Sequence, residues 1–192
     1  MVDSGMDTTD TATTDHPTDS TTHEMTFRPP TTADGGAMWR LARESGTLDL
    51  NTSYAYLLLA THFSATCRVA FDGDDAVGFV AAYRLPDDPS ALFVWQIAVD
   101  ERLRGRRVAA RLLDAVVDGT PGIARLETTV TTDNAASRRL FARWAESRGA
   151  ALTERLSERD GFVASHFPDG HDAEPLLVVA PLAPLAGADP GR

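Results

Sequence analysis

The sequence contains no lysine, a single cysteine and no long apolar run. A helix that crosses a bilayer needs about 20 predominantly apolar residues, so no membrane span is predicted. Because Cys67 is alone, an intrachain disulfide and a multi-cysteine metal site are both excluded. The first residues form neither the basic segment nor the apolar segment of a secretory signal, and we therefore expect a cytoplasmic protein.

Positive charge is also scarce. The chain has a formal net charge of -10, and all 18 of its strongly basic side chains are arginine. Nucleic-acid binding needs an extended basic face, which an acidic surface does not provide. The composition suits a protein that must stay soluble in concentrated salt, but a GC-rich genome produces the same arginine bias. Composition alone leaves both explanations open.

The chain is long enough for one domain with a substantial core, since it has 192 residues, of which 43% are hydrophobic. Residues 1–25 are rich in Thr, Asp and Ser and have too few apolar side chains to offset the entropy of ordering, so a disordered tail is predicted there. Residues 186–192 are expected to fray for the same reason. The folded domain is predicted over residues 26–185.

Hydrophobic periodicity switches repeatedly between helix and strand inside this domain. Alternating or continuous apolar runs predict strands, and apolar residues three and four apart predict helices. The expected strands lie at 25–29, 65–85 (two strands joined by a turn at 72–75), 91–99, 124–131 and 175–182, and the expected helices at 33–46, 52–63, 134–149 and within the segment that begins at 102. This pattern predicts an α/β fold, a mixed sheet of six to seven strands with helices on both faces.

Five of the few cations lie within residues 102–114, RLRGRRVAARLLD, directly after the strand at 91–99. A helix N-terminus has unpaired backbone N–H groups and a partial positive charge, which together bind phosphate. Gly105 permits a tight turn close to an anion, and guanidinium groups bind phosphate oxygens in pairs. The simpler alternative is a solvated, arginine-rich start of a helix. The strand–turn–helix context favours phosphate binding.

This segment and the one at 124–149 resemble the acetyl-CoA-binding motifs of the GCN5-related N-acetyltransferase family. The family's phosphate loop reads R/Q-x-x-G-x-G/A, whereas residues 104–109 read R-G-R-R-V-A, with arginine at the fourth position in place of the usual glycine. The sequence leaves two alternatives for Arg107: its side chain crowds the pyrophosphate, or its guanidinium contacts it. The resemblance implies that family's fold and acetyl-CoA as co-substrate. It also implies a set of cofactor contacts: Arg104, Gly105, Arg106, Arg107 and Ala109 at the pyrophosphate, Asn134 at the pantetheine arm, and the backbone N–H groups of Ile97 and Val99 at the pantetheine and the acetyl carbonyl.

A larger set of stretches is similar to the diaminobutyrate acetyltransferases within that family. They are LDLNTSYAYLLLATHFSATC, LFVWQIAVD, LETTVTTDNAASRRLF and GHDAEPLLVVAPL, in this order within residues 27–182. The first is the most specific, since acetyltransferases in general lack it. One departure is HDAE at 171–174, where HExE is expected. The resemblance implies acetyl transfer to the γ-amine of L-2,4-diaminobutyrate in ectoine biosynthesis, by direct attack in a ternary complex, and ectoine production agrees with a salt-adapted composition.

The chemistry of that reaction defines the candidate site. The acceptor amine is protonated near neutral pH, so the site must hold ammonium groups, remove a proton and stabilise a leaving thiolate. The family often uses a tyrosine acid where this chain has Phe141, so the acid must come from elsewhere. The resemblance implies substrate contacts from Asp49, Asn51, Tyr54, Trp95, His171 and Glu174, with Tyr54 as the general acid and Glu174 as a catalytic carboxylate.

Each of these residues also has a purely structural interpretation. Asp49 is suited to cap a helix, and Glu174 to be a charge at the start of a strand. Tyr54 and Trp95 are equally compatible with core packing. Tyr56 lies two positions after Tyr54, about 200° away around a helix, and is expected to be structural.

The remaining expectations concern metals, partners and other functions. No metal is expected, because acetyl transfer needs none and SHFPDGHD matches no strong metal-ligand spacing. The expected partners are a small diamino acid and a second copy of the chain, with no nucleic acid and no membrane. Two alternatives stay open: acetylation of another small amine or of a protein N-terminus, and an inactive module that only binds acetyl-CoA. The second is motivated by Arg107 and Phe141.

Overall fold

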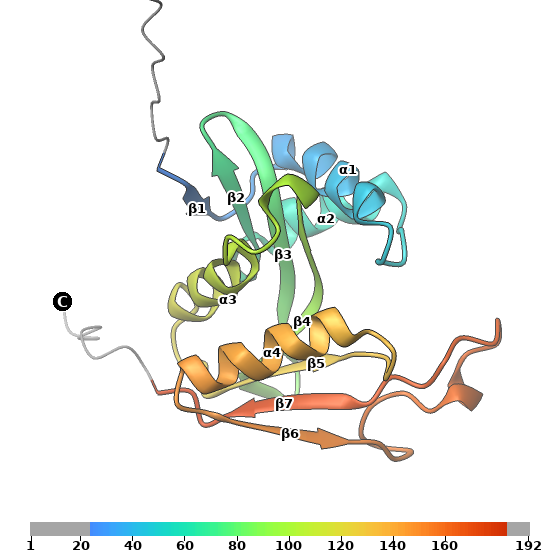
Figure 1. Ribbon diagram of the computed structural model, residues 1–192. Helices are drawn as coiled ribbons and strands as arrows, with labels where there is room; N and C mark the ends of the chain where they lie inside the picture. Colours follow the sequence, from blue (N-terminus) through green and yellow to red (C-terminus); the bar gives the residue numbers. More distant parts are fainter. Residues whose placement is uncertain (1–23, 184–192) are drawn as a thin grey trace, which may run out of the picture.

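The computed structural model describes residues 24–183 (Figure 1). Most of the predicted tail at 1–25, the predicted fraying at 186–192 and the last two residues of the predicted domain lie outside the described residues. Within the described part, Met25 is partly buried against the main core cluster. The folded part therefore includes Met25, which the composition places in the tail, because its apolar side chain finds a packing partner.

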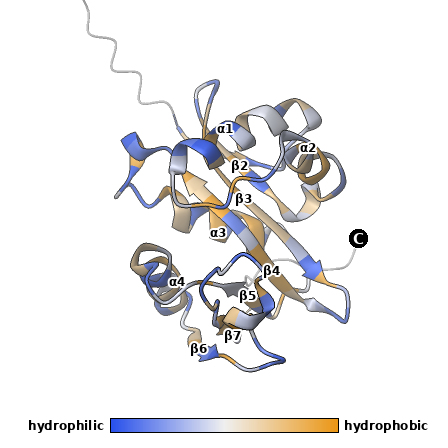
Figure 2. Ribbon diagram, turned by 90° about the vertical axis from the view of Figure 1, so that its right-hand side faces the viewer, coloured by the Kyte–Doolittle hydropathy of each residue, from blue (hydrophilic) through white to orange (hydrophobic). Residues whose placement is uncertain are grey.

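A seven-stranded mixed sheet forms the centre of the fold, with strand order β1-β2-β3-β4-β5-β7-β6. Neighbouring strands are antiparallel except β4 and β5, which are parallel. The strands are β1 (Thr26–Arg28), β2 (Arg68–Asp72), β3 (Asp75–Leu85), β4 (Asp88–Val99), β5 (Arg125–Thr129), β6 (Ala151–Arg155) and β7 (Leu176–Ala180). The strands in the middle of the sheet are mostly apolar (Figure 2), as expected for strands covered on both faces.

Four α-helices cover the two faces of the sheet, as predicted. They are α1 (Gly35–Ser45), α2 (Ser53–His62), α3 (Val108–Asp118) and α4 (Ala135–Ser147). One core cluster joins α1 and α2 to the sheet through Met38, Leu41, Tyr56, Leu59, Val69, Phe79 and Ala98. The other joins α3 and α4 to the opposite face through Leu112, Leu113, Val116, Phe141, Trp144, Val80, Leu126 and Leu177.

Turn chemistry sets several boundaries where the sequence predicts them. α1 ends at Gly46, which adopts a left-handed conformation with φ 63°. The β2–β3 hairpin turns at Gly73, with φ 60°. β6 has no counterpart among the predicted strands, because an edge strand pairs on one side only, and four of its five residues are exposed.

The parallel pairing of β4 and β5 opens partway along β4. Their register runs over 91–93 against 125–127. In the described part of the chain, no β5 pairing continues along the last six residues of β4, whereas the pairing with β3 extends to Val99. The sheet therefore splays between the C-terminal half of β4 and the end of β5.

Candidate active site

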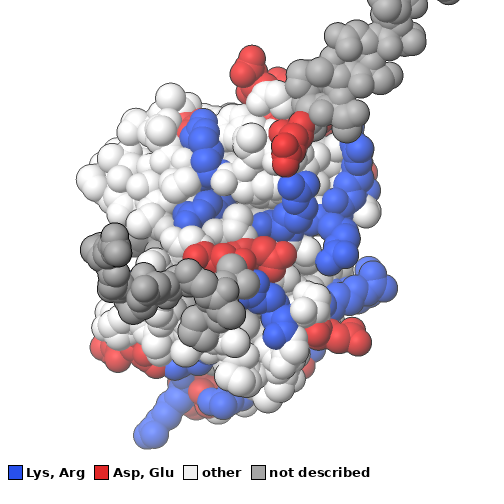
Figure 3. All heavy atoms as spheres, turned by 90° about the vertical axis from the view of Figure 1, so that its left-hand side faces the viewer, with Lys and Arg blue, Asp and Glu red and all other residues white. Residues whose placement is uncertain are grey.

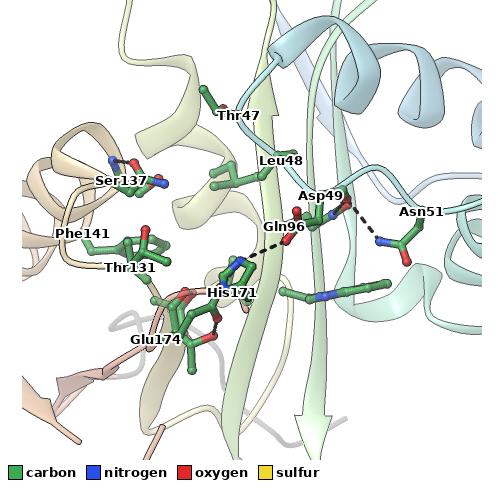
Figure 4. A pocket seen from close by; sticks show the side chains of 17 residues that line it. Thr47, Leu48, Asp49, Asn51, Gln96, Thr131, Ser137, Phe141, His171 and Glu174 are labelled. Carbon is green, nitrogen blue, oxygen red and sulfur yellow. Dashed lines mark hydrogen bonds and ion pairs between the residues drawn. The ribbon is translucent and has the colours of Figure 1, made fainter. Parts of the chain in front are cut away.

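A pocket lies at this splay and has a volume of about 210 Å³. It draws side chains from five places: the segment after α1, the second half of β4, the end of β5, the start of α4 and the segment before β7 (Figure 4). Its lining is Thr47, Leu48, Asp49, Asn51, Val94, Trp95, Gln96, Ile97, Thr128, Thr129, Val130, Thr131, Asn134, Ser137, Phe141, His171 and Glu174.

A β-bulge on β4 directs Trp95 into this pocket. Ala81 on β3 pairs with Gln96, but the next residue, Ala82, pairs with Val94, so Trp95 is the extra residue. A bulge changes the direction of a side chain and increases local twist. Trp95 accordingly keeps 42% of its surface exposed, while both of its neighbours are buried.

The amides of β4 supply backbone donors at the splay. Asp100 donates its N–H to Val77 of β3 at 2.8 Å. Because hydrogen bonding alternates along an antiparallel strand, Ala98 and Gln96 also face β3, and Ile97 and Val99 direct their N–H and C=O groups to the opposite side. That side is where β5 has diverged, so these two amides face the opening, where the family resemblance implies pantetheine.

Two carboxylates and an imidazole form the polar end of the pocket. His171 Nε2 lies 3.6 Å from Asp49 Oδ2 and 3.9 Å from Glu174 Oε1. Thr129 Oγ1 on β5 donates a hydrogen bond to Glu174 Oε2 at 2.5 Å. The arrangement brings together, from segments more than 120 residues apart, the acidic groups that the sequence nominates for ammonium binding.

His171 titrates in this acidic setting. Its Nδ1 donates to the carbonyl oxygen of Asp172 at 2.8 Å, and this hydrogen bond is the largest cause of a raised pKa. The carboxylates of Glu174, Asp49 and Asp169 raise the pKa of His171 further, whereas desolvation lowers it. The imidazolium form is therefore favoured here relative to an ordinary histidine.

Gly161 allows the loop around Phe162 to pack closely against Glu174, just before β7. Phe162 and Glu174 form an isolated antiparallel bridge, with both backbone N–H groups donating at 2.9 and 2.8 Å. Gly161, with φ 80°, lies so close to this bridge that a Cβ would be 2.6 Å from the Glu174 carbonyl oxygen and 2.8 Å from the Leu176 nitrogen. Only glycine fits, both by conformation and by space.

Most of the predicted substrate residues meet in the pocket, but Tyr54 does not. Asp49, Asn51, Trp95, His171 and Glu174 all line it. Tyr54 is absent from the lining and is 65% exposed. Helical geometry explains the difference, since Tyr56 on the other side of α2 is completely buried and Tyr54 faces outward. This placement gives no support to Tyr54 as the general acid.

Phe141 and several hydroxyl groups complete the wall on the α4 side. Phe141 is 1% exposed and lines the pocket together with Thr131 and Ser137. Asn134, predicted as a pantetheine contact, caps α4 by accepting a hydrogen bond from Ser137 N at 3.0 Å, and it also borders the pocket. Sequence reasoning did not single out Gln96, although a polar residue inside the apolar run LFVWQIAV is a detectable signal.

Most of the clustered arginines lie before α3 rather than within its first turns, namely Arg102, Arg104, Arg106 and Arg107, whereas Arg111 lies inside the helix. α3 begins at Val108, and the first backbone hydrogen bond of its N-terminus runs from Arg111 N to the Arg107 carbonyl at 3.0 Å. The N–H groups of residues 108–110 therefore have no partner inside the helix, as expected at any helix start. Gly105 provides the turn, with φ 80°.

Some of the clustered arginines are already neutralised. Arg102 pairs with Asp100 at 2.7 Å, and Arg104 pairs with Glu101 at 2.9 Å. Among the described residues, neither Arg106 nor Arg107 forms a salt bridge. Figure 3 shows the same mixture on the face that carries α3, where arginine and carboxylate side chains alternate.

Arg107 has an unusual backbone. Its φ is 60° and its ψ is 17°, the left-handed conformation, and it is the one non-glycine residue with positive φ among residues 24–183. The family motif has glycine at this position, and the backbone conformation supplies the physical reason.

The described region offers neither a cluster of metal ligands nor an exposed thiol. Residues 24–183 contain no group of three or more His, Cys, Asp or Glu side chains suited to a metal ion. Cys67 is fully buried, and desolvation raises its pKa to about 11, which keeps it as an unreactive thiol.

The fold and this site are those of an acyltransferase that binds its co-substrate at a splayed sheet. The sequence matches the acetyltransferase (GNAT) family over residues 36–145, and the chain belongs to that family. A solved structure, Ard1 from Thermoplasma volcanium, shares the fold at 20% identity with a TM-score of 0.65, covering 81% of this chain and 97% of that one. No helix in the described region is long and apolar enough to cross a membrane.

More similar relatives are diaminobutyrate acetyltransferases. The L-2,4-diaminobutyric acid acetyltransferase of Streptomyces coelicolor is 48% identical over 159 residues, which cover 80% of this chain and 91% of that protein. Its counterpart from Chromohalobacter salexigens is 42% identical over 161 residues, 82% of each chain. A solved structure of diaminobutyrate acetyltransferase EctA from Paenibacillus lautus, in complex with its substrate L-2,4-diaminobutyric acid and coenzyme A, is 40% identical with a TM-score of 0.78 over 84% of this chain and 97% of that one. Within the GNAT family, the chain groups with these enzymes.

Proposed function

We propose that the protein transfers the acetyl group of acetyl-CoA to the γ-amine of L-2,4-diaminobutyrate, giving N4-acetyl-L-2,4-diaminobutyrate. The observation that carries this proposal is one pocket that combines an acidic end, where His171 lies between Asp49 and Glu174, with the free amides of the β4 splay. The relatives described above, which share 40% identity or more, are named diaminobutyrate acetyltransferases, and this supports the acceptor.

The acidic end suits an acceptor with two ammonium groups. Asp49 and Glu174 supply two negative charges from opposite sides of His171. Trp95 provides an aromatic wall against which an alkylammonium chain packs, an arrangement that favours cations. Substrate ammonium groups balance the charge of these two carboxylates when the acceptor is bound.

The splayed strand suits acetyl-CoA. Two β4 amides, those of Ile97 and Val99, point into the opening, where they bond the pantetheine arm and polarise the acetyl carbonyl. Asn134 borders the same opening from α4. The turn at 104–107 and the N-terminus of α3 bind the pyrophosphate, with Arg104, Arg106 and Arg107 as cationic contacts.

Direct attack by the neutral γ-amine completes the reaction. The γ-ammonium first passes one proton to Glu174, which lines the pocket, and His171 Nε2, within 4 Å of that carboxylate, carries this proton on to solvent. The neutral amine then attacks the acetyl carbonyl, and the proton that its nitrogen loses on amide formation goes to the leaving thiolate. The leaving CoA thiolate, with a thiol-like pKa of about 8.5, departs with modest help. The proposed transfer needs no acyl intermediate, and the single cysteine could not form one in this site because it is buried outside the pocket.

The test is release of CoA thiol by the purified protein with a panel of acceptors: L-2,4-diaminobutyrate, ornithine, lysine and a peptide with a free N-terminus. The proposal requires the highest kcat/KM with diaminobutyrate. Asp49→Asn should raise the KM for that acceptor at least tenfold, roughly the loss of one charge-assisted contact. Asp87→Asn, an exposed carboxylate in the turn before β4, is the matched control and should not change it. Acetyl-CoA binding without thiol release on any acceptor would instead support an inactive module.

The proposed setting is a cytoplasmic homodimer in ectoine biosynthesis. Three exposed apolar side chains, Leu50 in the segment before α2 and Tyr54 and Leu57 within α2, support a contact surface for a second copy. Light scattering should then give twice the chain mass of 20.6 kDa. A mass equal to one chain at micromolar concentration would contradict the dimer.

A further inference from the structure

A buried hydrogen-bonded chain connects α2 to the loop that carries Asp49. The Tyr56 hydroxyl donates to Gln96 Oε1 at 2.9 Å, and Gln96 Nε2 donates to the backbone carbonyl of Asp49 at 2.8 Å. Tyr56 is completely buried and Gln96 is 5% exposed. Three elements that are far apart in sequence, α2, β4 and the 48–52 segment, therefore meet through two side chains.

The other end of the same segment, at Asn51, lies beside the same hydroxyl. Burial raises the pKa of Tyr56, and the neighbouring polar groups of Asn51 and Gln96 partly offset that rise. Asn51 Nδ2 is also 3.4 Å from the Asp49 carbonyl. The Asp49 side chain is 87% exposed, so its carboxylate has few direct restraints, and its position depends on how the backbone beneath it is held.

The position of Gln96 makes this chain relevant to the pocket. Gln96 follows the bulged Trp95 directly and precedes Ile97, whose amide faces the splay. One side chain therefore fixes the acceptor-binding loop relative to the strand that presents the acetyl group. A misplacement of about 1 Å in such a geometry costs on the order of a hundredfold in rate.

We propose that Tyr56 and Gln96 are positioning residues that set acceptor affinity by holding the backbone of residues 49–51 over the pocket. The assignment rests on the proposed function only for the identity of the acceptor. Neither residue acts on the reacting atoms. Tyr56 is completely buried, and the side-chain amide of Gln96 is engaged in the two hydrogen bonds described above.

The first test removes a single hydroxyl. Tyr56→Phe keeps the buried ring and its edge-to-face contact with Phe79 at 6.0 Å, so the fold should persist. The acceptor KM should rise about five- to tenfold, the usual consequence of losing one buried hydrogen bond, while the acetyl-CoA KM stays within about twofold. Tyr83→Phe, a hydroxyl deletion on β3 outside the pocket, is the matched control and should change neither constant.

The second test exchanges the donor of Gln96 for an acceptor. In Gln96→Glu, an ionised carboxylate keeps the bond from Tyr56 but repels the Asp49 carbonyl. Protonation restores a donor, and burial raises a glutamate pKa above its usual value of about 4.3. The ratio of acceptor Kd between variant and wild type should therefore fall as the pH is lowered from about 8 to about 5.5. His171, Asp49 and Glu174 are present in both proteins, so the ratio reports what the Gln96→Glu exchange adds.

A third measurement is independent of any substrate. Hydrogen exchange of the amides of residues 48–51 in the free protein should accelerate in Tyr56→Phe and not in Tyr83→Phe. If the wild type acetylates no diamine while this exchange does accelerate, the proposed function fails and the positioning role stands. Unchanged exchange, an equal rise of both KM values, or a pH-independent Kd ratio each overturns the positioning role.

Discussion

Replacing Arg107 by glycine should stabilise the fold and weaken acetyl-CoA binding at the same time. A left-handed conformation costs a non-glycine residue about 1–2 kcal/mol, and Arg107 has φ 60°. Glycine relieves that cost but loses about 0.5–1 kcal/mol to the greater freedom of the unfolded chain. With the middle of both ranges, the net gain is about 0.75 kcal/mol. For a chain of this size, each kcal/mol moves Tm by about 2–4 °C, so Arg107→Gly should melt about 1.5–3 °C higher.

Arg106→Gly is the matched control, since it removes the same charge from the adjacent position. Arg106 is exposed, has no positive φ and forms no salt bridge in the described structure. It therefore has no strain to relieve, and its replacement should cost about 0.5–1 kcal/mol. Calorimetry of the two variants without ligand compares the effects directly. If Arg107→Gly melts no higher than Arg106→Gly, the backbone argument is refuted.

The predicted weakening of acetyl-CoA binding in Arg107→Gly is measured separately, as the KM for acetyl-CoA. Arg107 has no carboxylate partner among the described residues, so its guanidinium is available to a phosphate. Losing a charge-assisted hydrogen bond should raise the acetyl-CoA KM about tenfold while the acceptor KM stays unchanged. An acetyl-CoA KM equal to that of the wild type would show that arginine at this position does not bind phosphate.

Three further predictions concern stability and pH. Gly161→Ala should lower kcat/KM about a hundredfold by displacing Glu174, while Gly170→Ala, with equal φ but open space, should not. Arg68→Met should cost about 2–4 kcal/mol in urea unfolding, because a buried guanidinium that bonds three backbone carbonyls is lost; a cost under about 0.5 kcal/mol would contradict this. His171 has a raised pKa, so its contribution to stability is present below the ordinary histidine pKa and fades as pH rises through the raised one. Acceptor binding should strengthen over the same rise, because the competing imidazolium is lost, and His171→Gln should abolish that pH dependence in calorimetric titrations.

Much of the fold could be predicted from local signals. Strong periodicity and glycine turns placed all four α-helices and six of the seven strands near their observed positions. β6 was not predicted. Only one of its side chains, Leu152, packs against the core, so the strand lacks the alternation of apolar and polar residues that burial of one face imposes. The N-terminal boundary of α3 was also displaced, since the turn that contains Gly105 and Arg107 depends on backbone conformations that residue types alone do not specify.

The sequence predicted most of the residues that line the site, but not the direction in which the side chains of α2 face. The family resemblance nominates Asp49, His171 and Glu174, and all three line the pocket. It also nominates Tyr54, but packing against the sheet turns Tyr56 inward and leaves Tyr54 exposed and outside the pocket lining. Gln96 was missed because its role depends on a bulge and on a loop carbonyl from a distant segment, neither of which leaves a spacing in the sequence.

The position of the acetyl group on the product tests the account most directly. The purified protein is incubated with acetyl-CoA labelled with ¹³C at the carbonyl and with L-2,4-diaminobutyrate, and the product is examined by long-range carbon–proton NMR correlation. The account predicts that the labelled carbonyl correlates with the γ-methylene protons. A correlation with the α-methine proton, or no acetylated diaminobutyrate at all while acetyl-CoA still binds, would contradict it.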